Sequence, residues 1–223
     1  MKESSNIIVQ PSNNGISRIK LNEPSTYNAL SLNTLETLIK SFKKFNDDEK
    51  TKVIIIEGIG KGFSAGHNLK EINSLKGKPD YKKLFTLCSD LMINIINNNK
   101  PVIAKVHGAA FAAGCQLVAT CDLALSTNDA IFATPGVNIG LFCSTPMVAV
   151  SRNVGRKKTM KMLLTGDPIN AEYAKEIGLI NENMDVQLGK VYTDKDQPPF
   201  KGQEELNKTV QNKAPLGLDT PLT

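Results

Sequence analysis

The 223-residue chain has no tryptophan and only two histidines, and its four cysteines include no CxxC pair. Two histidines without metal-like spacing argue against a zinc site. Isolated cysteines among apolar or small residues indicate reduced thiols rather than disulfides. Basic residues do not cluster with aromatic ones, and no apolar run could cross a membrane. We therefore expect no metal, no nucleic-acid partner and no membrane span.

The N-terminus, MKESSNIIVQ, lacks an apolar signal core and contains one lysine, one glutamate and no arginine. This composition matches neither a secretory signal nor a transit peptide, so we expect no clear targeting signal. The net charge of +5 is a mild basic excess, which suits an anionic small ligand.

The most informative stretch is residues 101–125, PVIAKVHGAAFAAGCQLVATCDLAL. Its pattern predicts a buried strand at 101–106, a loop of small residues at 107–114, a helix from Cys115 and a strand at 123–126. The first N–H groups of a helix have no internal partners, and together with the helix dipole they can hold an anion or a developing oxyanion. Alternatively, the small residues only permit close packing between layers.

The remaining pattern alternates strands with helices. Strands are expected at 7–10, 16–21, 53–57 and near 129–132, and helices at 32–45, 80–97, 145–154, 157–164 and 171–177. Ser31 is the expected N-cap of the first helix, and Asn68 with Glu71 has capping-box spacing. Parallel strands with covering helices would fit a Rossmann-type sheet. However, Gly58, Gly60 and Gly62 do not match a dinucleotide-binding or P-loop spacing.

Five ordered motifs between about residues 7 and 185 resemble the enoyl-CoA hydratase/isomerase (crotonase) family. They are LNEPSTYNALS (21–31), KGFSAGHNLKEI (61–72), the Gly- and Ala-rich stretch at 107–122, FATPGVNIGLFCSTP (132–146) and LLTGDPINAEYAKEIGLI (163–180). The resemblance implies an α/β fold of the ClpP/crotonase type, a spiral of ββα units, in place of a Rossmann sheet.

The resemblance also implies a site for an acyl-CoA thioester as substrate or ligand, with no other cofactor. The family stabilises an enolate with two backbone N–H donors, which correspond to His67 and Ala113. The residues expected to line the substrate path or the reacting centre are Asn28, Ala29, Leu30, Ser64, Ala65, Gly66, Gly114, Gln116 and Gly136.

The hydratases of this family use two glutamates, and this chain has Gln116 and Gly136 at those positions. Glutamine cannot accept a proton and glycine has no side chain, and residues 132–146 contain no Asp or Glu. We therefore leave three interpretations open. The chain is an enoyl-CoA hydratase/isomerase-like protein of fatty acid metabolism, a non-catalytic acyl-CoA-binding or regulatory protein, or a shortened product that folds poorly alone.

The composition divides the chain into a core domain at 1–185 and a divergent tail at 186–223. The tail is rich in proline without sustained periodicity, so we expect it to be poorly ordered. The family builds homotrimers or hexamers through C-terminal helices that this tail does not resemble. By resemblance the protein belongs in the mitochondrial matrix, with the cytoplasm as the alternative.

Overall fold

The computed structural model describes residues 6–184, so the predicted tail at 186–223 lies outside the described residues. The strands are β1 (Ile7–Asn13), β2 (Ile16–Leu21), β3 (Val53–Gly58), β4 (Gly62–Ser64), β5 (Val102–Val106), β6 (Ala109–Phe111), β7 (Leu123–Thr127), β8 (Ile131–Ala133), β9 (Ile169–Asn170) and β10 (Glu182–Met184). The helices are α1 (Leu32–Asp47), α2 (Leu69–Ser74), α3 (Lys78–Ile96), α4 (Ala113–Thr120), α5 (Ser144–Asn153), α6 (Arg156–Thr165) and α7 (Ala171–Glu176), with short 3-10 turns η1 (Pro24–Thr26) and η2 (Pro135–Ile139).

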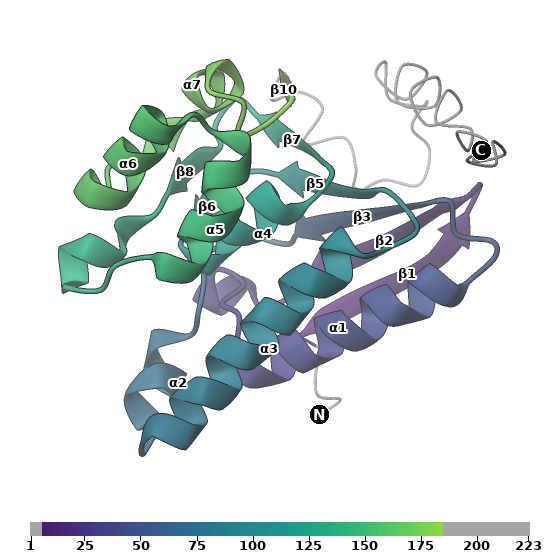
Figure 1. The fold of residues 1–223 in the computed structure, drawn as a ribbon. Helices are drawn as coiled ribbons and strands as arrows, with labels where there is room; N and C mark the ends of the chain where they lie inside the picture. The colour runs from purple at the N-terminus through teal and green to yellow at the C-terminus, as the bar shows by residue number, and fades with distance from the viewer. Residues whose placement is uncertain (1–5, 185–223) are drawn as a thin grey trace, which may run out of the picture. The chain divides into compact units, whose positions relative to one another are not determined.

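The strands form two sheets, in the orders β1-β2-β3-β5-β7-β10 and β4-β6-β8-β9 (Figure 1). The pairs β3–β4, β5–β6 and β7–β8 each place their first strand in the large sheet and their second in the small one, and a helix follows. This repeat confirms the predicted spiral of ββα units. A Rossmann sheet would instead keep all of its parallel strands in one sheet.

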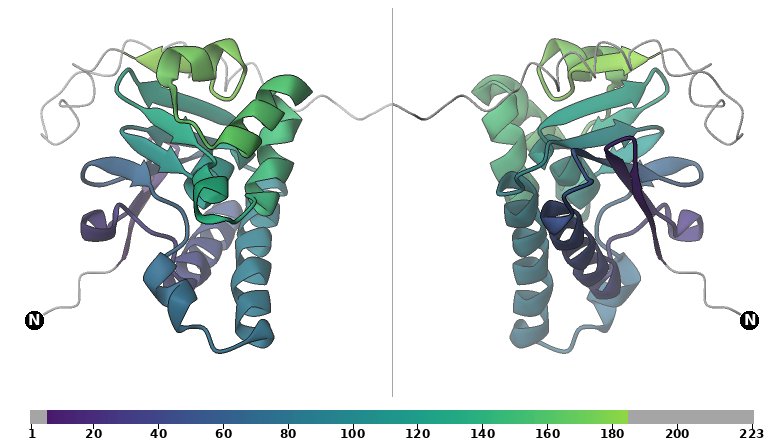
Figure 2. Two further views of the ribbon diagram at one scale, coloured as in Figure 1. Left: turned by 90° about the vertical axis from the view of Figure 1, so that its left-hand side faces the viewer. Right: turned by 90° about the vertical axis from the view of Figure 1, so that its right-hand side faces the viewer.

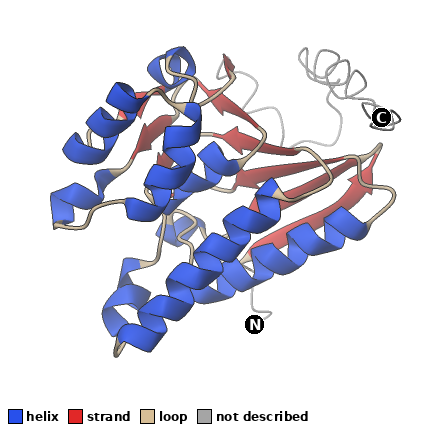
Figure 3. Ribbon diagram, in the orientation of Figure 1, coloured by secondary structure: helices blue, strands red, loops and turns tan. Residues whose placement is uncertain are grey.

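The core lies between the large sheet and the helices α1, α3 and α4 (Figures 2 and 3). Helix α1 contributes Leu35, Leu38, Phe42 and Phe45, which are at most 1% exposed. Fully burying a side chain of this kind contributes about 1.5–3 kcal/mol. The helical spacing of these residues therefore anchors α1 to the sheet.

The helix caps explain where two helices begin. Ser31 Oγ accepts a hydrogen bond from the backbone nitrogen of Thr34 at 3.2 Å, as predicted. Asn68 caps α2 by accepting from the nitrogens of Lys70 and Glu71. Only half of the predicted capping box forms: Asn68 accepts from the nitrogen of Glu71, but Oε2 of Glu71 accepts from the nitrogen of Leu32 at 3.0 Å and not from that of Asn68. Glu71 therefore ties α2 to the start of α1, a long-range contact that local spacing does not reveal.

Two further expectations are corrected. The first strand runs on to Asn13 instead of ending at residue 10. The turn is Asn14-Gly15, whose φ angles of 51° and 85° suit a two-residue hairpin. The stretch 107–114 is not all loop, since it contains β6 and the start of α4. Alanine has weak strand propensity, so β6 depends on pairing with β4 and β8, which the local sequence does not show.

Candidate active site

The loop after β4 passes the N-terminus of α4 at very short range. Gly66 has φ +89°, and a Cβ atom on it would lie 3.0 Å from the nitrogen of Ala113 and 2.8 Å from the carbonyl oxygen of Phe111. A Cβ atom on Gly114 would lie 2.3 Å from the carbonyl oxygen of Ser64. Only glycine permits these approaches, so both glycines hold the loop against the helix.

The backbone N–H groups of His67 and Ala113 have no hydrogen-bond acceptor among residues 6–184. Ala113 is the first residue of α4, where opening N–H groups lack intrahelical partners and the helix dipole is positive. Two unpaired donors on adjoining segments are what an oxyanion hole requires. The structure thus brings together the two predicted donors, while their contact with a thioester carbonyl stays a prediction.

Ala112, directly before this helix, has a strained backbone. Its φ of 49° and ψ of −118° fall outside the regions that L-residues ordinarily occupy. The strain is held by hydrogen bonds on both sides, because its nitrogen donates to the carbonyl of Ala133 and its carbonyl accepts from the nitrogen of Gln116, each at 2.9 Å. Strain of this kind collects at functional sites, where the surrounding structure fixes it.

The side chain of Asn28 cross-links neighbouring loops through hydrogen bonds to their backbone. Its Nδ2 donates to the carbonyls of Ile59 and Gly62 at 2.9 Å, and its Oδ1 accepts from the nitrogen of Glu23 at 2.9 Å. The hydroxyl of Ser64 donates to the Asn28 carbonyl at 2.9 Å. Both side chains are buried and committed to backbone partners. They shape the loop, and their direct contact with a ligand stays a prediction.

The other residues of this predicted path differ in exposure. Leu30 is fully buried, and its nitrogen donates to the carbonyl of Gly66 at 2.7 Å. Ala29 is buried as well, whereas Ala65 is exposed. Of Ala29, Leu30 and Ala65, only Ala65 presents its side chain to the surface.

The imidazole of His67 is packed inside the protein. Its Nδ1 lies 3.4 Å from the carbonyl of Leu30, and the ring meets that of Phe85 edge-on at 5.9 Å. Its Nε2 is buried without a hydrogen-bond partner among the described residues. Burial lowers the pKa of His67, and the hydrogen bond to Leu30 offsets only part of this effect. The ring is therefore held neutral near pH 7.

Gln116, at one of the glutamate positions, is 4% exposed in the first turn of α4. Its Oε1 lies 3.8 Å from Sγ of Cys88 on α3. Gln116 lines a pocket of about 330 Å³ between α3, α4 and α5, whose apolar wall includes Met92, Ile96 and Val148. Gln116 thus follows the donor of Ala113 by three residues, a rise of about 4.5 Å along the helix.

Gly136, at the other glutamate position, lies buried in η2. A Cβ atom on it would lie 2.2 Å from the carbonyl oxygen of Leu141 and 2.8 Å from Sγ of Cys143. The backbone here therefore leaves no room for any side chain. A carboxylate could not be restored at this position without moving the 141–143 segment.

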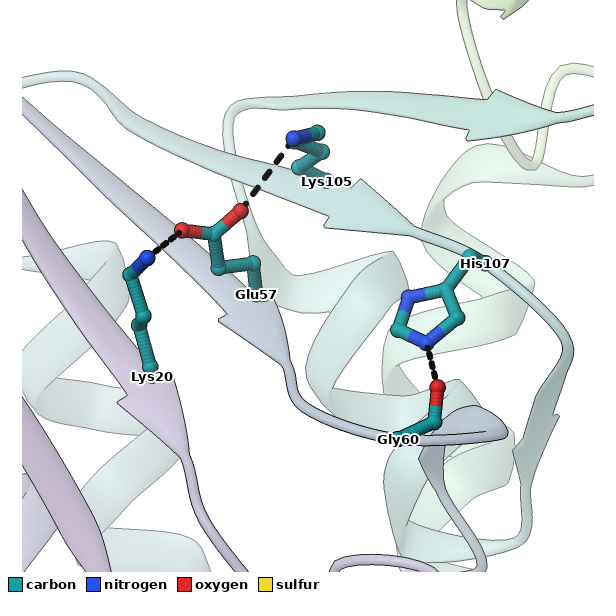
Figure 4. Close-up of polar contacts among 5 residues, drawn as sticks. All are labelled: Lys20, Glu57, Gly60, Lys105 and His107. Atoms are coloured by element: carbon teal, nitrogen blue, oxygen red, sulfur yellow. Dashed lines mark hydrogen bonds and ion pairs between the residues drawn. The ribbon is translucent and has the colours of Figure 1, made fainter. Parts of the chain in front are cut away.

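Sequence reasoning missed a charged cluster beneath the loops (Figure 4). Glu57 on β3 lies between Lys20 on β2 and Lys105 on β5, at 3.3 Å from each ammonium. Burial raises the pKa of Glu57, but the positive charges of Lys105 and Lys20 outweigh it and hold the pKa below its usual value. Nearby, Nε2 of His107 pairs with the carbonyl of Gly60 at 2.8 Å. These contacts connect the ends of β3 and β5, the strands that directly precede β4 and β6 in the chain. The sequence did contain a signal for this cluster, because Glu57 is a charged residue in the otherwise apolar strand VIIIE (53–57).

Among residues 6–184, no group of three or more His, Cys, Asp or Glu side chains could hold a metal ion. In the same part of the chain, no helix is both long and apolar enough to cross a bilayer.

Comparison with known proteins gives consistent matches. The family model described as enoyl-CoA hydratase/isomerase matches residues 11–188. Enoyl-CoA hydratase domain-containing protein 3 of Danio rerio, named as mitochondrial, is 48% identical over 179 residues, 80% of this chain and 62% of the relative. The crystal structure of the human protein of that name has a TM-score of 0.79 at 40% identity, covering 93% of this chain and 76% of the other.

An enoyl-CoA hydratase of Mycobacterium smegmatis has a TM-score of 0.83 at 41% identity, over 94% of this chain and 76% of the other. The segments AAGCQLVATCD and FATPGVNIGLFCSTP most resemble the branch of enoyl-CoA hydratase domain-containing protein 3, and these comparisons confirm that assignment. The chain spans less than two thirds of the length of the curated relatives it matches, for example 62% of the zebrafish and 55% of the human protein.

Proposed function

Because the chain belongs to the enoyl-CoA hydratase/isomerase family, we propose that it binds acyl-CoA thioesters and polarises their carbonyl between the N–H groups of His67 and Ala113. The observation that carries this proposal is the contact of Gly66 with the start of α4, since it assembles two unpaired donors. The coenzyme A thioester is the ligand in this proposal, and the protein acts in fatty acid metabolism.

Backbone donors give this site a defined chemical capacity. Hydrogen bonds aimed at a developing oxyanion each typically contribute about 10²–10³ in rate. With a thioester carbonyl held by both donors, negative charge on its oxygen is stabilised, and the carbon next to the carbonyl becomes easier to deprotonate. The backbone of the site can thus stabilise an enolate even where the side chains differ.

The side chains do not support efficient hydration by the two-glutamate route. A general acid or base usually contributes about 10²–10⁴, and such contributions are not additive. Gln116 cannot accept a proton, and the backbone around Gly136 excludes a side chain. This favours the second candidate function, a protein that binds acyl-CoA without hydrating it and acts as a regulator or interaction partner.

Location and assembly are also inferred by resemblance. Relatives carry the word mitochondrial in their names, which supports the mitochondrial matrix over the cytoplasm as the proposed compartment. A homotrimer or hexamer remains the proposed assembly, because the family forms one.

The test is calorimetric titration of the purified full chain with acetyl-CoA and crotonyl-CoA, followed by an assay of crotonyl-CoA hydration on the same sample. We expect binding with hydration far below the rates of ordinary family members. Gly66→Ala should weaken binding, since its Cβ would collide with the backbone of Phe111 and Ala113. Gly15→Ala is the matched control, because it adds the same left-handed strain at φ +85° in the distant hairpin turn.

Each outcome is decisive. A folded sample that binds neither ester would overturn the proposal. Rapid hydration would show that another group moves the proton, with the buried imidazole of His67 as the first suspect. Equal loss of binding in both glycine variants would remove the support drawn from the Gly66 contact.

A further inference from the structure

Helix α6 presents an exposed face on which apolar and basic side chains lie side by side. Its buried residues are Thr159, Met162 and Leu163. The exposed residues of its other face include Arg156, Lys157, Met160, Lys161 and Leu164. Spacings of three and four residues make these side chains neighbours on one side of the helix. Met160 and Leu164 are 39% and 59% exposed, so both apolar side chains lie open to solvent.

The turn η2 and the loop after it extend this exposed face. Their large exposed apolar residues are Ile139, Leu141 and Phe142. The end of α6 packs on η2, because Oγ1 of Thr134, directly before η2, donates to the carbonyl of Met162 at 2.9 Å. A Cβ atom on Gly166 would lie 3.1 Å from Cα of Pro135, and Figure 1 shows both elements along the same edge. The α6–η2 surface is defined here as Ile139, Leu141, Phe142, Arg156, Lys157, Met160, Lys161 and Leu164.

The charge of the α6–η2 surface has one sign. Residues 130–166 contain no Asp or Glu, and their basic residues are Arg152, Arg156, Lys157, Lys158 and Lys161. Lys158 is paired with Glu176 of α7 at 3.0 Å. Within residues 6–184, no ion pair involves Arg156, Lys157 or Lys161. These cations are therefore available to an anionic partner.

A partner for this surface must accept both its positive charge and its apolar side chains. Nucleic acid offers phosphates but no place for aliphatic side chains such as Ile139 and Leu164. A second copy docked symmetrically would bring the cations of both copies together, and like charges facing each other disfavour association. An anionic lipid bilayer meets both demands, because basic side chains reach its phosphates while apolar ones enter the boundary of the acyl chains.

We propose that the α6–η2 surface docks the protein on the surface of an anionic phospholipid bilayer. The inference goes beyond the proposed function and does not depend on thioester binding. Each basic residue near an anionic membrane strengthens binding about fivefold, so Arg156, Lys157 and Lys161 together contribute about 100-fold. Because these cations are exposed, salt should weaken the attraction. The apolar side chains add a contribution that neutral lipid also supplies.

The experiment is cosedimentation of the purified full chain with vesicles of phosphatidylcholine alone, and with vesicles of phosphatidylcholine mixed with phosphatidylglycerol. We expect the chain to bind the anionic vesicles about 100-fold more tightly than the neutral ones. Raising the salt concentration from about 0.1 M to about 1 M should remove most of this difference, since the Debye length falls from about 10 Å to about 3 Å.

Two variants with matched controls assign the binding to this surface. Lys157→Gln with Lys161→Gln should weaken binding to anionic vesicles about 25-fold. Its control is Lys40→Gln with Lys44→Gln, an exposed pair of the same spacing on α1. Leu164→Gln keeps every charge and should weaken binding about fivefold or more. Its control is Ile93→Gln on α3, where the side chain is 53% exposed. All of these side chains are exposed, and thermal unfolding confirms that each variant is folded.

Each result supports or overturns the docking. A folded chain that binds neither kind of vesicle, or both equally, overturns it. Equal losses in the two lysine pairs would mean that only net charge matters, and full binding by Leu164→Gln would mean that no apolar side chain enters the lipid; either result refutes the proposal. Light scattering on the wild type and on Leu164→Gln tests the rival occupant. An oligomer that this substitution dissociates, without vesicle binding, would assign the surface to a second copy.

Discussion

The strained backbone of Ala112 allows a stabilising mutation to be predicted at the centre of the site. An L-residue held in a forbidden region costs about 1–3 kcal/mol, and glycine at φ 49° and ψ −118° removes the clash of the Cβ atom. Glycine also makes the unfolded chain more flexible, which costs about 0.4–1 kcal/mol. The difference predicts that Ala112→Gly stabilises the protein by about 0.5–2 kcal/mol.

The measurement is urea denaturation at neutral pH, followed by a thermal scan. The midpoint should rise with an unchanged slope, because the surface exposed on unfolding is the same. In a domain of this size, each kcal/mol of added stability raises Tm by about 2–4 °C. The predicted stabilisation therefore corresponds to a rise in Tm of about 1–8 °C. The control is Ala119→Gly in the same helix, where backbone strain is absent and glycine should destabilise by about 0.5–1 kcal/mol or more. A lower midpoint for Ala112→Gly would show that the backbone is not strained there.

Three other predictions concern the surroundings of the site. Glu57→Gln should destabilise by about 1–3 kcal/mol at neutral pH, because it removes the ion pairs of the carboxylate with Lys20 and Lys105. As the folded-state pKa of Glu57 is lowered, this difference should shrink as pH falls below 4.5, and denaturation midpoints that stay equally far apart would contradict it. The lowered folded-state pKa of His67 means that wild-type stability should decline as pH falls below 6.5, more steeply than in His67→Gln; parallel pH profiles would refute this. Asn28→Ala should cost about 3 kcal/mol, since three backbone groups lose partners, and a loss well under 1 kcal/mol would rule out its bracing role.

Local patterns were enough to predict several elements of this fold. The apolar spacing of α1 and the hydroxyl of Ser31 define that helix without reference to the rest of the chain. The glycines at 66 and 114 were identified through the family motifs, and the structure supplies their physical reason in the backbone atoms of Phe111 and Ser64.

Features that depend on distant residues could not be predicted. The strand β6 is a run of alanine and phenylalanine whose conformation depends on neighbours about 20–50 residues away. The bond from Glu71 to the start of α1 and the thiol of Cys88 beside Gln116 join segments 39 and 28 positions apart. Sequence spacing identified the residues at the site, but not these contacts between distant segments.

The central claim is that a thioester carbonyl lies between the N–H groups of His67 and Ala113. Isotope-edited infrared spectroscopy of acetyl-CoA, labelled with carbon-13 at the thioester carbonyl, tests it directly in the full-length protein. Two hydrogen bonds should shift the carbonyl stretch of the bound ligand to lower frequency than in solution, and Gly66→Ala should diminish that shift. A bound ligand whose carbonyl frequency equals that of the free ester would contradict the account.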